Sequence, residues 1–172
     1  MGNLKQSFFA GLFSIFTIGI LTLLTYKTDY GVFLIASFGS SMVLLFGYPE
    51  SPFARPKNVF FGHVLTALVG IFFFHFIPLP LFIVIPLAVG FGVGLMILFN
   101  VTHPPAGGNP IIVIIGGVSI EYLLSPVISG SIIIIIFAIV LNRFILKKKI
   151  SKLNYLFASN SISVLDIPDL LK

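Results

Sequence analysis

The sequence predicts an all-α polytopic membrane protein with six membrane segments, and three observations support this fold class. Of its 172 residues, 58% are hydrophobic and 9% are charged, whereas soluble domains carry about 25% charged residues. Mean hydropathy is +1.15. The apolar residues are grouped in runs close to the length of about 20 residues that a helix needs to cross a bilayer.

Four of the apolar runs are uninterrupted and are expected to cross the membrane as continuous helices. They cover residues 8–26, 59–76, 81–100 and 122–146. The first run is too long for the apolar core of a secretory signal peptide, and no small-residue cleavage site follows it. We therefore expect it to be retained as the first membrane helix.

The other two segments, at residues 30–47 and 102–118, are predicted to be broken. The first half of 30–47 is rich in Gly and Ser, and the polar, Pro- and Gly-rich run 102–110 precedes only eight apolar residues. Eight helical residues reach about 12 Å, against a hydrocarbon core of about 30 Å. Each broken segment is predicted to be an extended stretch followed by a half-helix, beginning near Ser40 and near Asn109. Non-helical backbone at membrane depth must face protein or water, and such breaks are typical of transport sites.

The two broken segments also resemble each other in sequence. Residues 39–47 align without gaps to residues 108–116, with two matching glycines and five matching apolar positions. Each block is the middle of a three-segment unit, about 8–76 and about 81–146. An odd number of crossings per unit makes the second unit inverted relative to the first, which is a common transporter plan. We expect one transmembrane domain over 1–150 and a short cytoplasmic or membrane-surface tail over 151–172.

Glycines in the fourth segment predict self-association. Gly90, Gly92 and Gly94 recur at alternate positions, and small residues let helices approach closely in a membrane. We therefore expect a homo-oligomer embedded in the lipid bilayer.

The charges predict the orientation. With six crossings, the N-terminus, the loop 48–58 and the C-terminus share one side of the membrane. That side collects most of the basic residues, namely Lys5, Arg55, Lys57, Lys147, Lys148, Lys149 and Lys152, and the other side carries Lys27, Asp29 and Glu121. The positive-inside rule places the basic side, with both termini, in the cytoplasm, most simply at a cell (inner) membrane. The basic cluster formed by Lys147, Lys148, Lys149 and Lys152 is not expected to bind nucleic acid.

The geometry of the broken segments suggests a site for an anion. If both half-helices begin near mid-bilayer, their free N–H groups and positive dipole ends favour negative charge. The candidate substrate-binding residues are Gly39, Ser40, Ser41, His103, Gly107, Gly108 and Asn109. The hydroxyl and amide side chains donate hydrogen bonds, and the glycines let backbone N–H groups approach a ligand. His103 serves as a contact or as a protonation switch.

Several kinds of chemistry are disfavoured. The chain has no Cys, which excludes disulfides and thiolate metal sites. No acidic or basic residue other than His lies well inside a segment, and three scattered histidines do not predict a metal site. We expect no cofactor and no enzymatic activity. Two alternatives remain open: a small membrane enzyme that uses His63 and His103, and a non-transporting membrane subunit that supports a partner protein.

The run from His103 to Pro110, His-Pro-Pro-Ala-Gly-Gly-Asn-Pro, resembles the signature of the HPP family of integral membrane proteins. Residues 36–41, residues 49–58 and the Gly62-His63 pair also resemble that family, and the similarity spans roughly residues 8–146. The resemblance implies a small membrane transporter. Plastid and cyanobacterial members are described as nitrite transporters, so nitrite is the first expectation for the anion.

Overall fold

One helix, α3 (Pro56–Phe76), lies at the centre of the protein and packs against elements from both halves of the chain. The computed structural model describes residues 4–29 and 31–145, so the predictions for the lysine cluster after residue 146 and for the tail lie outside the described residues. The first half contains α1 (Leu4–Lys27), α2 (Ala36–Met42), the π-helical turn η1 (Val43–Gly47), the 3₁₀ turn η2 (Pro52–Ala54) and α3. The second half contains α4 (Leu81–Leu98), the 3₁₀ turn η3 (Pro104–Gly108), α5 (Asn109–Gly116), the π-helical turn η4 (Leu123–Ile128), α6 (Ser129–Val140) and the π-helical turn η5 (Leu141–Ile145).

Four helices are long and apolar enough to cross a membrane. They are Leu4–Lys27, Pro56–Phe76, Leu81–Leu98 and Leu123–Phe144, and they coincide with the four uninterrupted runs of the sequence. No strand occurs in the described ranges. The prediction of an all-helical membrane protein is therefore confirmed. Helix boundaries shift for local reasons: Pro56 begins α3 because proline suits a first helical turn, and α4 ends before Asn100, whose φ is 54°.

The two remaining segments contain helices too short to span a bilayer. The first is the helix of residues 36–47, formed by α2 and η1, and the second is α5 with eight residues. Two details of the prediction are wrong. The first short helix begins at Ala36, not near Ser40. The run before α5 is a compact 3₁₀ turn, not an extended stretch, because the two prolines fix φ at a value that suits such a turn.

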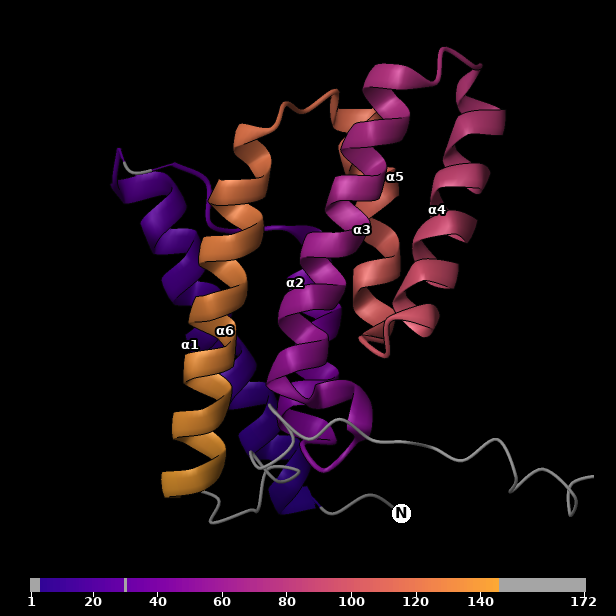
Figure 1. Ribbon diagram of the computed structural model, residues 1–172. Coiled ribbons are helices and arrows are strands. Elements are labelled where there is room, and N and C mark those ends of the chain that lie inside the picture. Colours follow the sequence, from indigo (N-terminus) through magenta and orange to yellow (C-terminus); the bar gives the residue numbers. More distant parts are fainter. Residues whose placement is uncertain (1–3, 30, 146–172) are drawn as a thin grey trace, which may run out of the picture.

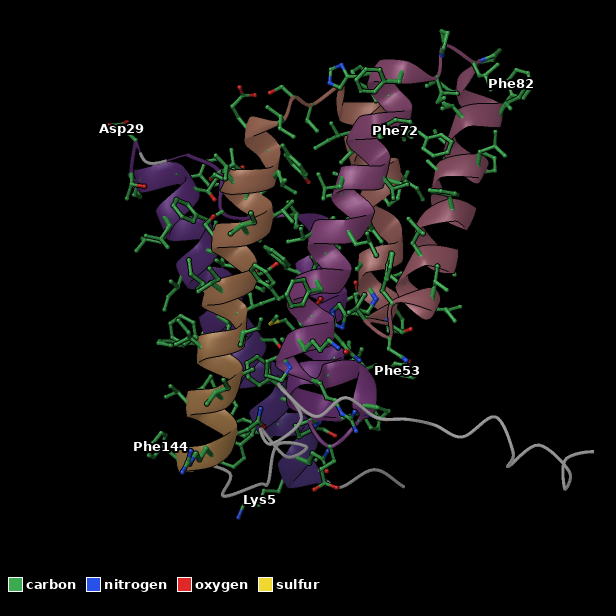
Figure 2. All side chains as sticks on the ribbon, viewed as in Figure 1. Lys5, Asp29, Phe53, Phe72, Phe82 and Phe144 are labelled. Carbon is green, nitrogen blue, oxygen red and sulfur yellow. The ribbon has the colours of Figure 1, made fainter. Side chains whose placement is uncertain are left out.

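Figure 1 shows how the helices are arranged. α1 and α6 lie together on one flank, α4 lies on the other, and α5 packs between α3 and α4. The start of α1 and the end of η5 lie at one end of the molecule, whereas the turns after α3 and α5 lie at the opposite end. Figure 2 shows the side chains at these two ends: Lys5 and Phe144 lie at one end of the molecule, and Asp29 lies at the other.

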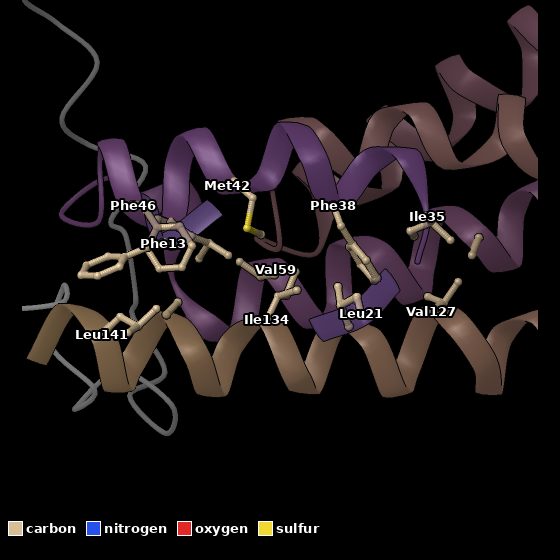
Figure 3. Close-up of a cluster of buried hydrophobic side chains, with 14 of the residues drawn as sticks. Phe13, Leu21, Ile35, Phe38, Met42, Phe46, Val59, Val127, Ile134 and Leu141 are labelled. Atoms are coloured by element: carbon tan, nitrogen blue, oxygen red, sulfur yellow. The ribbon is translucent and has the colours of Figure 1, made fainter. Parts of the chain in front are cut away.

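The main apolar core fills the space between α1, α2, α3 and α6 (Figure 3). Phe38, Phe46, Leu21 and Ile134 are fully buried there. A smaller core holds α3, α4 and α5 together. Large apolar side chains also cover the outside; Phe82 is 78% exposed. An outer surface of this kind is stable only against lipid or another apolar surface, as expected of an integral membrane protein.

Two glycines on α3 allow the η3–α5 segment to pack closely against that helix. A Cβ at Gly62 would lie 2.9 Å from the Cβ of His103, and one at Gly70 would lie 2.9 Å from the Cα of Pro110. Of the three α4 glycines, only Gly92 meets a neighbouring element, whereas Gly90 and Gly94 have no heavy atom within 4 Å. These two glycines therefore do not serve packing within the protomer.

Candidate functional site

A cluster of buried polar side chains lies where α2, α3 and the η3–α5 segment meet. Its members are Ser37, Ser41, His63, Thr66, His103 and Asn109, each at most 5% exposed. Burying a polar group without a hydrogen-bond partner is costly. The hydrogen bonds among these side chains therefore define the geometry of the site.

Asn109, the first residue of α5, is the centre of the cluster. Its Oδ1 accepts a 2.7 Å hydrogen bond from the hydroxyl of Ser37. Its Nδ2 donates to the backbone carbonyl of His63 at 3.1 Å and to Oγ1 of Thr66 at 3.0 Å. Because a carbonyl oxygen only accepts, these bonds determine which way the amide faces. Since Ser37 lies in the first turn of α2, the bond from its hydroxyl joins the N-terminal turns of the two short helices.

The two histidines share the hydroxyl of Ser41. Its Oγ lies 3.1 Å from Nε2 of His63 and 2.9 Å from Nε2 of His103, and the ring centroids are 5.0 Å apart. Nδ1 of His103 lies 2.8 Å from the carbonyl oxygen of Phe53. That carbonyl can only accept, so Nδ1 of His103 carries a proton.

The other ring has the opposite tautomer when it is neutral. Nδ1 of His63 faces Nδ2 of Asn109 at 3.1 Å. An amide nitrogen donates but does not accept. The proton of neutral His63 therefore sits on Nε2, which points at Ser41.

Local structure holds the two rings in place. Thr66 lies one turn after His63 on the same face of α3, and its hydroxyl donates to the carbonyl of Gly62 at 2.8 Å. The ring of Phe38 packs edge-on against His63 with centroids 5.1 Å apart. The amide of Asn58 donates to the carbonyl of Pro52 at 3.0 Å and so supports the η2 turn that presents the carbonyl acceptor to His103.

The structure brings together three of the predicted site residues, Ser41, His103 and Asn109. Gly39 and Ser40 are exposed on another face of α2, and the hydroxyl of Ser40 donates to its own helix backbone. Gly107 and Gly108 are half-buried in η3. A Cβ at Gly107 would face Val93 of α4, away from the cluster.

The residues predicted to bind substrate did not include Ser37, Thr66 or His63, although His63 was named in the family resemblance and in the enzyme alternative. Helical spacing was the available signal. Ser37 lies four residues before Ser41, and Thr66 lies three residues after His63, and both intervals bring side chains to one face of a helix.

The cluster can donate and accept hydrogen bonds and can bind a proton. It contains two imidazoles, one amide and three hydroxyls, and no carboxylate. Nowhere in the described ranges do three or more His, Cys, Asp or Glu residues gather as a metal site would require.

These features define a class: a polytopic α-helical membrane protein whose two short helices meet at a buried polar cluster. The family model described as "HPP, transmembrane region" matches residues 1–151, and the chain belongs to the HPP family. The resemblance of the His103–Pro110 run is thereby confirmed.

Curated relatives are also membrane proteins. A transmembrane protein of Dictyostelium discoideum is 34% identical over 126 residues, which cover 67% of this chain and 43% of that protein. A second transmembrane protein of the same organism is 31% identical over 161 residues, which cover 86% of this chain and 50% of the relative. The matched region thus spans half or less of these relatives. No solved structure matches the chain.

Proposed function

We propose that the protein transports a small inorganic anion across the membrane, and that the anion binds where the N-terminal turns of α2 and α5 meet. The observation that carries this proposal is the hydrogen bond between Ser37 and Asn109, which places the two helix starts side by side. The N-terminal end of a helix carries a partial positive charge and unpaired N–H groups. Two such ends directed at one point favour an anion there.

The side chains at this junction are suited to oxyanions. The hydroxyls of Ser37 and Ser41 and the amide of Asn109 supply donors, and the cluster contains no carboxylate to repel negative charge. These donors bond to one another in the structure. Binding would replace those internal bonds with bonds to the anion, an exchange that costs less than leaving buried donors unpaired.

The directions of the short helices support the inverted-repeat plan. Ser41 of α2 lies beside His63, whereas Ser37, one turn earlier, reaches Asn109 beside Thr66, so α2 runs antiparallel to α3. α5 runs parallel to α3, because Pro110 lies against Gly70 and Gly117 lies near Phe74. The short helices therefore lead away from their junction in opposite directions, as two inverted three-segment units require.

We extend the proposal to substrate and assembly. Nitrite is the first candidate, on the strength of the resemblance to transporting HPP members, and the protein is a carrier or channel without enzymatic activity. The face of α4 that carries Gly90 and Gly94 is open and is a suitable contact in a homo-oligomer. The side that carries the 48–55 turn would be cytoplasmic.

The test is anion flux into proteoliposomes that contain the purified protein. Nitrite, nitrate, formate and chloride are compared, with protein-free liposomes as the blank for each anion. Flux above the blank for at least one anion is expected. A protein indistinguishable from the blank for all four would contradict the proposal.

A matched pair of variants locates the site. Ser37→Ala removes a donor at the junction and should lower flux about tenfold, equivalent to one hydrogen bond to a charged group of about 1.5 kcal/mol. Ser40→Ala removes the same group from an exposed face of the same helix and should leave flux unchanged. Loss of flux in Ser40→Ala but not in Ser37→Ala would move the site to the other face of α2.

A further inference from the structure

Two histidine rings that share the Ser41 hydroxyl lie beside the proposed anion site. We infer that each anion crosses together with one proton, held on Nε2 of His103 with the Ser41 hydroxyl as its partner. The inference rests on the proposed function and deepens it, because it names the coupled ion.

The first argument is geometric. When His103 is neutral, its Nδ1–H donates to the carbonyl of Phe53, and Nε2 accepts from the hydroxyl of Ser41 at 2.9 Å. The carbonyl oxygen of Ser37 lies 3.0 Å from the same hydroxyl and is a second acceptor within reach. The Ser41 hydroxyl therefore has two acceptors for its single proton.

Protonation of His103 uses that second acceptor. A proton from hydronium makes one N–H bond on Nε2 and leaves one neutral water behind, and the new N–H then donates to Oγ of Ser41. The Ser41 hydroxyl turns to the Ser37 carbonyl. Oγ has two lone pairs, so it accepts from both His63 and His103. Every polar hydrogen at these three side chains keeps a partner in both states, and only a hydroxyl rotation separates them.

The second argument is the number of protons. Two positive rings with centroids 5.0 Å apart, both fully buried, would repel each other strongly. On His63, Nδ1 faces the amide nitrogen of Asn109, which cannot accept a hydrogen bond, so a second proton on that ring would have no partner. The pair therefore takes up one proton.

The third argument is charge balance. A buried ion is costly unless an opposite charge accompanies it. The elements packed around the two histidines supply no charged side chain that could balance a proton, because α2, α4, α5, η2 and η3 contain no acidic or basic residue. On α3, His75 is exposed near the far end, and Lys57 lines a surface groove with Phe61 and Phe99. Arg55 and Glu50 precede α3 in the loop, where Glu50 is exposed.

The anion and the proton thus stabilise each other in the same site. The anion supplies the negative charge that a buried imidazolium needs, and the imidazolium supplies the positive charge that a buried anion needs. Binding of either one favours binding of the other, and by thermodynamic reciprocity the coupling is equal in both directions. The pair that crosses carries no net charge.

The experiment measures what drives flux in proteoliposomes, with nitrite and nitrate as probes and protein-free liposomes as the blank under each condition. An inward proton gradient should raise accumulation about tenfold per pH unit for one proton per anion. A K⁺ diffusion potential of about 100 mV should leave it unchanged, whereas uncoupled movement of one charge would respond about 50-fold. Flux that follows the potential and ignores the pH gradient overturns the proton coupling but leaves anion transport standing. No flux at all overturns both proposals.

Variants assign the coupling to the named residues. Ser41→Ala and His103→Gln should abolish the dependence on the pH gradient. His75→Gln, on an exposed position of α3, should retain it. A pH dependence in Ser41→Ala and His103→Gln equal to that of the wild type would overturn the assignment. If either variant fails to fold, the wild-type measurement still decides whether transport is electroneutral.

Discussion

Asn109 joins elements from both halves of the chain, because its side chain bonds to three other members of the polar cluster at once. Its amide accepts from Ser37 and donates to His63 and Thr66. Asn109→Leu would leave the hydroxyl of Ser37 and Nδ1 of His63 buried without these partners, at about 1–3 kcal/mol for each group, whereas the hydroxyl of Thr66 keeps its bond to Gly62. We therefore predict a loss of several degrees in thermal unfolding temperature, measured in detergent, together with reduced anion flux.

The control for this prediction is Ser40→Ala. Ser40 is exposed and bonds only within its own helix, and surface changes of this kind usually stay within about 0.5 kcal/mol. If Asn109→Leu unfolded at the wild-type temperature, the amide would not hold the cluster together.

At the residue scale, the sequence predicted which segments form the polar cluster better than it predicted which residues in them belong to it. The break after residue 100 singled out His103 and Asn109 because a polar run is conspicuous between apolar segments. Ser40 and Ser41 could not be separated, since adjacent helical residues differ by about 100° in direction and the facing neighbour was unknown. Thr66 gave no compositional signal within an otherwise apolar helix.

Among the elements, the close contact between α6 and the start of α2 allows a sharp test. A Cβ at Gly130 would lie 2.6 Å from the carbonyl oxygen of Phe33 and would also meet the ring of Phe38, which packs against His63. We predict that Gly130→Ala destabilises the protein by about 1–3 kcal/mol, as overpacking usually does. The measurement is the thermal unfolding temperature in detergent.

Gly19→Ala, in α1, is the matched control, because nothing lies within 4 Å of the added methyl group. Alanine is the better helix former by about 1 kcal/mol, so this variant should be as stable as the wild type or more so. Equal stability of the two variants would mean that α6 and α2 do not approach as closely as described.

Elements were predicted well where a run of about 20 apolar residues decided the outcome, as for α3 and α4. The start of α2 was misplaced because Gly and Ser are weak helix formers in isolation. Packing decides it instead: Phe38 and Met42, one turn apart, are both buried in the core. The 3₁₀ turn of residues 104–108 was likewise hidden, since proline pairs fit both extended and tightly turned backbone.

For the whole molecule, charge separates the two ends of the bundle. Lys5 lies at one end and Asp29 at the other (Figure 2). Arg55 directly precedes α3, and Lys57 lies in its first turn. Sequence periodicity alone cannot decide whether the residues between Asp29 and Glu50 cross the membrane, because their helix is only residues 36–47. A crossing here would need the non-helical stretch 31–35 as well. At about 3.3 Å per extended residue and about 1.5 Å per helical residue, the two parts together reach at most about 34 Å, against a core of about 30 Å.

Single cysteines at Asp29 and Glu50 test this crossing, and the absence of native Cys makes each label specific. Both side chains are exposed. With the basic end cytoplasmic, a membrane-impermeant thiol reagent added to intact cells should label Asp29→Cys, whereas Glu50→Cys should react only after permeabilisation. Labelling of both from outside would mean that the segment between them enters and leaves on one side. The reverse pattern would keep the crossing and invert the orientation, because the positions would still lie on opposite sides.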